Sequence, residues 1–565
     1  MKLSYIRFVL PLAVSLALPG FLLTSRADDV TQQKISSTKN SAIDFSDLDT
    51  LIVHEGGRQK PFLVFAEEST LALTGKRKFK ANDEALAAEP FITHLWLEGQ
   101  EWDKIPLIYV SHIPLKNETG LPEATSHFSY YDLADNTAFV QLLNEAAAAR
   151  APKPGESSPK LTGLLKEVAE VGMRMALYEN ITRGRAPRLR PGESNNWTPL
   201  PASDPHISAL IQALKNNDPT AFTEAASKLQ DWQKQLAPEK ILSPKILTLE
   251  VLYQKIHPFR IAWIFYLAAG ILLVVTMTRS LLWLSRPGYI LAWLLALVGL
   301  LFQIFGFVAR VFIAGRAPVT NMYESVIWVA FGTVFFALLF ELKSRGRYFL
   351  LGAIPVAVLS LILADGYPHA LDPSISPLVP VLKHNFWLTT HVLTITLSYA
   401  AFALALGVAH IPLSLVILGK KPSPNLYQYV YRALQVGVLL LALGTILGGV
   451  WANYSWGRFW DWDPKETWAL IALLVYLFIL HGRIAGRWSG FGTAVGAILG
   501  FQSIIMAWYG VNFVLGVGLH SYGFGTGGRG MALSFVTLEC IFVAFAIVRH
   551  LASRSNKSPA KKVAA

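Results

Sequence analysis

Cysteine is almost absent from this sequence, and charged residues are scarce. Cys540 is the only cysteine among 565 residues, which excludes an internal disulfide, a CxxC redox pair and any zinc or iron–sulfur site made of several thiolates. Because Cys540 lies in an apolar run, we expect a small, buried hydrophobic residue there. Charged residues make up 16% of the chain and hydrophobic residues 53%, a balance that predicts membrane spans.

A net charge of +12 raises the question of nucleic-acid binding. The Lys and Arg residues lie mainly in short loops between apolar runs and in the last stretch, "RHLASRSNKSPAKKVAA". Cytoplasmic loops of membrane proteins carry this excess of positive charge. The charge therefore indicates an orientation in a membrane, and we expect no nucleic-acid partner.

Long apolar runs dominate the chain from residue 259 onward. Each approximates the ~20 residues that cross a bilayer core, and the expected spans are 259–279, 289–309, 322–341, 347–364, 386–408, 431–451, 465–482, 491–510 and 531–550. The loops richest in Lys and Arg are then cytoplasmic, near 279–287, 342–347, 418–430, 482–490 and 549–565. The pattern predicts an all-α polytopic membrane protein with about 9–10 transmembrane helices.

The first 257 residues have a different character. Residues 1–26 place Lys2 and Arg7 ahead of an apolar stretch, which predicts either a signal peptide or an N-terminal membrane anchor. Residues 27–257 contain no run long enough to span a bilayer, so we expect an extracytoplasmic soluble domain of mixed or mainly helical structure. A transmembrane domain over 258–552 and a basic cytoplasmic tail over 553–565 complete the expected organisation.

Tryptophan is concentrated in one segment between two apolar runs, "WANYSWGRFWDWDPKETWAL" (451–470). The end of this segment predicts the start of a helix. Asp463 is a suitable N-cap, Pro464 suits the first helical position, and Glu466 would complete a capping box. These three residues are explained by local structure alone.

That local structure does not explain Trp456, Trp460, Trp462 and Trp468. An aromatic belt at the membrane surface accounts for one or two of them. Trp456 and Trp460 are four residues apart, so any helical turn there would present an aromatic face. Beside such a face, a helix N-terminus offers N–H groups to an anion. The combination suits a planar apolar molecule that carries carboxylates, such as haem, and a plain interfacial belt is the alternative.

Three histidines bear on this choice. His391 falls in the first turns of a span that starts outside, and His520 follows a span that ends outside, so both are expected at the depth of the tryptophans. Two neutral imidazoles there could bind iron from its two axial sides, although each could also be a hydrogen-bonded residue at a helix end. His481 lies 17 residues after Pro464, about 26 Å along a helix, and could simply reach the lipid headgroups.

Four stretches resemble the CcsA type of cytochrome c biogenesis protein, the haem-handling subunit of the system II cytochrome c synthase. They are "WGRFWDWDPKETWALI", "HVLTITLSYA", "RAPVTNMYESVIW" and "NFVLGVGLHSYGF". The tryptophan segment, 451–468, resembles that family's WWD motif. The resemblance covers about 260–550, roughly half of the chain, and implies a multi-pass protein of the bacterial cytoplasmic membrane with its WWD loop on the outer side.

The resemblance also implies roles for single residues. His391 and His520 correspond to the two external axial iron ligands, and His481 to the transmembrane histidine on the path of haem. The tryptophans and Asp463 would form the binding platform for non-covalent haem b.

The implied reaction is thioether formation between haem and the CxxCH cysteines of an apocytochrome c, or alternatively haem export without ligation. No residue of this chain is an obvious nucleophile or base, so the protein would position and protect haem while the substrate thiols react. A complete CcsB half is missing from the pattern of this sequence. The expected partners are therefore a CcsB/ResB-like membrane subunit, apocytochrome c and a thiol-reducing protein.

Overall fold

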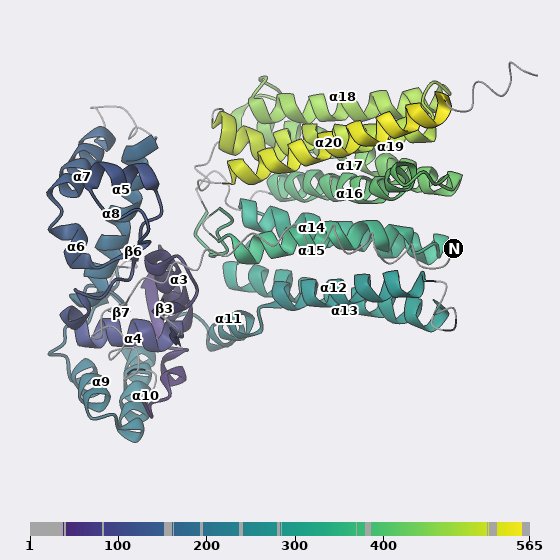
Figure 1. Cartoon of the computed structure of the whole chain (residues 1–565). Helices are drawn as coiled ribbons and strands as arrows, with labels where there is room; N and C mark the ends of the chain where they lie inside the picture. Colours follow the sequence, from purple (N-terminus) through teal and green to yellow (C-terminus); the bar gives the residue numbers. More distant parts are fainter. Residues whose placement is uncertain are drawn as a thin grey trace, which may run out of the picture. The chain divides into compact units, whose positions relative to one another are not determined.

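The computed structural model describes residues 38, 41–81, 84–151, 161, 163–192, 196–236, 241–278, 283, 285–368, 370–378, 386–516, 518 and 528–555. The predicted leader or anchor over 1–26 lies outside these residues, as does most of the predicted basic tail. The chain divides into two compact units, Met1–Leu247 and Thr248–Ala565 (Figure 1). The limits expected for the leader, the soluble domain, the membrane domain and the tail stay predictions.

The first unit is mainly helical, as its sequence predicts. Its helices are α3 (Phe62–Thr74), α4 (Ala88–Glu98), α5 (Ile113–Thr119), α6 (Tyr130–Ala134), α7 (Thr137–Arg150), α8 (Gly163–Thr182), α9 (Pro205–Lys215) and α10 (Pro219–Leu236), with α11 (Pro244–Ile256) crossing the limit between the units. Two short 3₁₀ turns are η1 (Phe45–Leu48) and η2 (Gly99–Trp102).

The strands of this unit form four antiparallel pairs, each of two strands. They are β1 (Ile52–Glu55) with β2 (Arg58–Pro61), β3 (Phe79–Ala81) with β4 (Glu84–Leu86), β5 (Ile108–Tyr109) with β6 (His127–Phe128), and β7 (Arg188–Arg190) with β8 (Thr198–Pro199). Isolated two-stranded pairs are marginal in water. The helices around them must therefore supply most of the stability.

A buried carboxamide joins distant segments of the first unit. The Gln233 side chain, from α10, donates to the carbonyls of Ile52 (2.9 Å) and Leu189 (2.8 Å) and accepts from the Ile52 N–H (3.2 Å). Its three hydrogen bonds satisfy backbone groups of β1 and β7 that burial removes from water.

Aromatic rings fill part of the apolar core of this unit. The rings of Phe79 and Phe91 stack with their centroids 4.8 Å apart, and both pack on Trp102.

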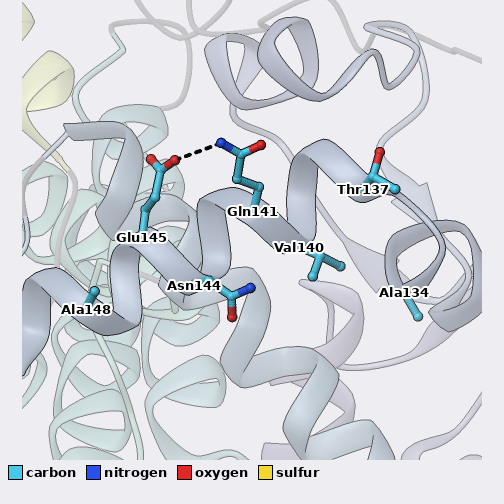
Figure 2. A pocket seen from close by; sticks show the side chains of 7 residues that line it. All are labelled: Ala134, Thr137, Val140, Gln141, Asn144, Glu145 and Ala148. Carbon is cyan, nitrogen blue, oxygen red and sulfur yellow. Dashed lines mark hydrogen bonds between the residues drawn. The ribbon is translucent and has the colours of Figure 1, made fainter.

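The surface of α7 has a shallow groove, shown in Figure 2. Its lining side chains are small or neutral except for one carboxylate: Ala134, Thr137, Val140, Gln141, Asn144, Glu145 and Ala148. The Gln141 amide donates to Glu145 across one helical turn (3.3 Å). Nothing in this lining assembles a nucleophile, an acid–base pair or a metal site.

The second unit is a bundle of long apolar helices. They are α12 (Pro258–Thr276), α13 (Ser285–Ala314), α14 (Met322–Ser344), α15 (Tyr348–Gly366), α16 (Phe386–Ile417), α17 (Pro424–Trp456), α18 (Pro464–Ile484), α19 (Gly490–Ile505) with the π-helical η6 (Met506–Leu515), and α20 (Arg529–Ser555). Within the described residues, nine helices are long and apolar enough to cross a membrane. The nine predicted spans and the all-α polytopic fold are confirmed.

Helix α16 is the centre of this bundle. It packs against α14, α15, α17, α19 and α20, and α16 with α17 forms the most extensive pair (Figure 1). Helix α20 lies at the edge and is mostly exposed, which suits a surface that faces lipid. The expectation that Cys540 is buried is wrong, because this residue lies on the exposed side of α20.

A buried ion pair holds the connection between α13 and α14. The Arg310 guanidinium donates to one oxygen of Glu324 through Nη2 (2.7 Å) and Nε (3.1 Å), and through Nη1 to the Tyr253 hydroxyl and the Pro373 carbonyl. The second Glu324 oxygen accepts from the N–H (2.7 Å) and hydroxyl of Thr320. Arg310 and Glu324 are each 1% exposed, so every polar group in this pair depends on these partners.

Candidate functional site

The tryptophan loop, residues 456–463, joins α17 to α18. Helix α17 ends where Gly457 adopts a left-handed conformation and its N–H donates to the Asn453 carbonyl (3.0 Å). The loop that follows is not helical until Pro464. The four-residue spacing of Trp456 and Trp460 therefore does not produce a helical aromatic face.

The start of α18 matches the sequence prediction in part. Asp463 is the N-cap and accepts from the Lys465 N–H (3.0 Å), and Pro464 occupies the first helical position. The predicted capping box is wrong, because Glu466 accepts from the Asp461 N–H (2.8 Å) instead of the N-cap N–H. Trp462 has a positive φ of 56°, a conformation uncommon for residues other than glycine. This turn brings Asp461 within reach of Glu466.

Two edge-to-face pairs of tryptophans lie at the end of α17 and in the loop. Trp451, inside α17, and Trp456 have ring centroids 4.6 Å apart, and Trp460 and Trp462 are 5.8 Å apart. Trp462 remains 69% exposed. The loop thus presents aromatic surface at the end of the bundle.

A cation accompanies these rings. The Arg458 guanidinium lies 5.2 Å from the Trp456 ring centroid and pairs with Glu466 (3.0 Å) and Asp461 (3.4 Å). Trp468 lies half-buried in the second turn of α18. The loop therefore combines apolar faces with a guanidinium whose charge two carboxylates of the same segment already balance.

His391 lies beside this loop. Its Nδ1 is 2.7 Å from the Gly444 carbonyl oxygen of α17. A carbonyl can only accept, so Nδ1 carries a proton, and a neutral form of this ring would present Nε2 as its acceptor nitrogen. The ring packs on Gly448, and the next residue, Gly449, packs on the Phe459 ring of the tryptophan loop. Adjacent residues of α17 thus bring the histidine and the loop to the same end of the bundle.

The other two predicted histidines have different outcomes. His481 lies exposed on α18, about 26 Å along the helix from Pro464, and its Nδ1 bonds to the Leu477 carbonyl (2.8 Å). It is therefore not part of the cluster around His391. His520 lies outside the described residues. A side chain added to Gly518 would come within 2.4 Å of Asp463 Oδ1, so the chain two residues before His520 contacts the N-cap of α18.

Sequence reasoning missed Lys465 and Trp508. The Lys465 ammonium donates to the carbonyls of Ala507 (2.9 Å) and Trp508 (3.2 Å) in η6. The Trp508 indole in turn donates to the Ser325 hydroxyl (2.9 Å) and packs on the Tyr399 ring (5.9 Å). Lys465, Ser325 and Tyr399 belong to three of the four stretches that resemble CcsA proteins, and Trp508 lies just before the fourth. These contacts therefore join all four parts of the chain. A lysine at a membrane edge was the available signal, and π-helical turns often mark functional sites.

The described residues beside the tryptophan loop include one of the predicted iron ligands, His391. Among the residues that the structure describes, no group of three or more His, Cys, Asp or Glu side chains could hold a metal ion. An iron porphyrin supplies four nitrogens of its own and takes one or two imidazoles from the protein. His391, which lies beside exposed aromatic surface and in its neutral form would present Nε2, fits that requirement.

The chain is similar to known proteins of cytochrome c maturation. Residues 319–520 match the family described as cytochrome C assembly protein. Protein NrfI of Wolinella succinogenes is 29% identical over 506 residues, which cover 82% of this chain and 53% of NrfI. The chain thus spans about half the length of that relative.

Shorter relatives are more similar over a smaller part of the chain. Cytochrome c biogenesis protein CcsA of Guillardia theta is 37% identical over 239 residues, which are 37% of this chain and 78% of that protein. CcsA of Prochlorococcus marinus is 37% identical over 250 residues, or 77% of its length. Among solved structures, cytochrome c heme lyase CcmF aligns with a TM-score of 0.37 and 14% identity, over 55% of this chain and 51% of CcmF.

Proposed function

The chain belongs to the CcsA family of cytochrome c biogenesis proteins, and from this membership we propose that it binds haem and presents it for attachment to apocytochrome c. The observation that carries the proposal is the setting of His391. Its Nδ1 proton is engaged by the Gly444 carbonyl (2.7 Å), and in our proposal Nε2 is the nitrogen that binds the iron.

Haem is the substrate in this proposal, and the loop supplies what it needs. Exposed aromatic rings, Trp462 at 69% and Phe459 at 50%, offer apolar surface to a flat macrocycle. Arg458 lies beside Trp456 but is already paired with Asp461 and Glu466, so binding a propionate there would require the propionate to replace one of these carboxylates. We propose Trp456, Trp460, Trp462, Asp463 and Trp468 as the platform, with His391 and His520 as axial ligands. Because the sequence has one cysteine and no CxxCH, two thioether bonds to this chain cannot hold the haem, and we propose non-covalent haem b.

The attachment step depends on how the haem vinyl groups and the substrate thiols are positioned, more than on a catalytic side chain of this chain. Each substrate cysteine adds its S–H across a vinyl C=C of haem, so that sulfur bonds one carbon and the proton goes to the other. The step consumes no oxidant or reductant. Holding the vinyl edge at the end of the bundle converts a bimolecular encounter into a reaction between held groups, which can supply much of the rate.

The same proposal assigns a direction and partners. The basic loops place the tryptophan loop on the outer side of a bacterial cytoplasmic membrane and His481 near the inner side. Haem would then meet His481 before it reaches His391. Apocytochrome c is the acceptor, a separate CcsB/ResB-like subunit completes the path, and another protein keeps the acceptor thiols reduced.

We predict that the full chain, purified from membranes in detergent, contains haem b. The pyridine haemochrome should have the b-type spectrum, and acidified acetone should extract the haem because no thioether holds it. A preparation without haem, even when a CcsB-like subunit is co-expressed, would refute the proposal. A reporter with a CxxCH motif then separates two activities: covalent haem on the reporter indicates a synthase, and a haem-loaded chain without that product indicates an exporter.

Replacing His481 with Ala tests the direction of transfer. We expect less haem per protein, with an unchanged absorption spectrum for the haem that does arrive, because His481 lies about 26 Å from the outer start of α18. Haem content by haemochrome and the spectrum of the same sample are the measurements. Normal loading of His481→Ala without any partner subunit would show that haem does not use this residue.

A further inference from the structure

Helices α16 and α17 cross through a row of glycines. Three positions of α17 that face side chains of α16 are glycines: Gly437, Gly444 and Gly448. Gly437 meets Phe402, Gly444 meets Ile395, and Gly448 meets His391. The steps are seven and four residues on both helices, so one antiparallel seam contains all three contacts.

Gly448 is the position where this seam meets the histidine. A Cβ added there would lie 2.6 Å from Cε1 of His391, 2.9 Å from Nδ1 and 3.2 Å from Nε2. Carbon atoms in contact are normally separated by about 3.5–4.0 Å. The imidazole therefore rests directly on the backbone of α17, and any side chain at 448 must displace it.

A second group of α17 restricts the ring further. The Gly444 carbonyl, one turn away, receives the Nδ1 proton at 2.7 Å. The residue after Gly448 contacts the tryptophan loop instead, since a Cβ at Gly449 would lie 2.5–2.8 Å from the Phe459 ring. The position of the histidine relative to the tryptophan loop is thus set by consecutive residues of a single helix.

We propose that Gly448, together with the Gly444 carbonyl, is a positioning site that aims His391 Nε2 at the iron of haem. Gly448 contacts no substrate and acts only through His391. The inference rests on the proposed haem-binding function, because it assigns how that ligand is aimed. Groups that orient a metal-binding histidine commonly change metal affinity about 10–100-fold when they are replaced.

The test compares Gly448→Ala with Gly437→Ala in the full chain, purified in detergent. Both substitutions add one methyl group to the same seam, and both clash with a ring, since a Cβ at Gly437 would lie 2.6 Å from Phe402. We expect haem affinity to fall about 10–100-fold only in Gly448→Ala. Its spectrum should lose the signature of two nitrogen ligands and regain it with added imidazole, while Gly437→Ala keeps the wild-type spectrum.

A second measurement does not depend on haem. In the haem-free protein, Gly448→Ala should lower the thermal unfolding midpoint when His391 is present and have little effect in a His391→Ala background, because the clash is with that ring. Equal destabilisation in both backgrounds would overturn the inference, even if Gly448→Ala loads poorly.

The outcomes separate this inference from the proposed function. If the purified wild-type protein contains no haem, the proposed function is wrong. Wild-type protein with haem and Gly448→Ala with an unchanged spectrum and affinity refutes only the positioning role. Loss of the nitrogen-ligand spectrum in both glycine variants would also refute it, because the effect would then belong to the seam as a whole.

Discussion

Replacing His391 with Ala should lower haem loading and cytochrome c maturation by at least about 100-fold, because the substitution removes an axial ligand rather than a group that supports one. The methyl side chain leaves space on Gly448 where the ring lay. Imidazole added to the growth medium or to the purified protein should occupy that space and restore part of the loading. The measurements are haem per protein, the absorption spectrum and covalent haem on a CxxCH reporter.

Thr390→Ala is the matched control for this experiment. Thr390 is the preceding residue in the same turn of α16, and its hydroxyl donates to the Phe386 carbonyl of its own helix (2.8 Å). We expect this variant to load haem like wild type. If the His391→Ala variant matures cytochromes normally, His391 is not an iron ligand, even though Gly444 and Gly448 hold its ring in place.

Arg310→Met should destabilise the membrane unit by about 3–5 kcal/mol, because the Glu324 carboxylate would remain buried without its partner. Glu324 is 1% exposed and cannot recover the lost interaction from water. Restoring charge balance with Arg310→Met/Glu324→Gln should recover much of the loss, since Gln can still accept from the Thr320 N–H. The unfolding midpoint of the detergent-solubilised chain reports the effect.

Arg260→Met offers a comparison in the same unit. Arg260 pairs with both oxygens of Asp365 at 2.8 and 2.9 Å, but their side chains are 39% and 25% exposed. Pairs that water reaches contribute about 0–1 kcal/mol. Similar losses for Arg310→Met and Arg260→Met would mean that burial does not determine the strength of these pairs.

Sequence reasoning was most successful where a property is local. The apolar runs predicted every one of the nine helices that the structure describes as long enough to cross a membrane, because bilayer thickness sets a length that each segment must meet by itself. Asp463 and Pro464 predicted the start of α18 for a similar reason, since a helix end must satisfy its own N–H groups.

Prediction failed where one residue had two possible partners. Glu466 was expected to bond to the N-cap and instead bonds to the Asp461 N–H and Arg458. The positive φ of Trp462 makes that choice, and nothing in the local sequence indicates it. Cys540 was expected inside and lies outside, because an apolar residue on a membrane helix can face lipid as well as protein.

The sequence alone determined that this chain has repeated runs long enough to cross a membrane, that five of its 16 tryptophans lie around one helix start, and that it resembles proteins of cytochrome c biogenesis. Only the tertiary structure decided what orients His391, because Gly444 and Gly448 come from a helix more than 50 residues away. It also decided that Lys465 joins α18 to η6 through two carbonyls. Backbone carbonyls and the absence of a Cβ leave no pattern in a sequence, so they gain meaning only when packed helices bring them against a side chain.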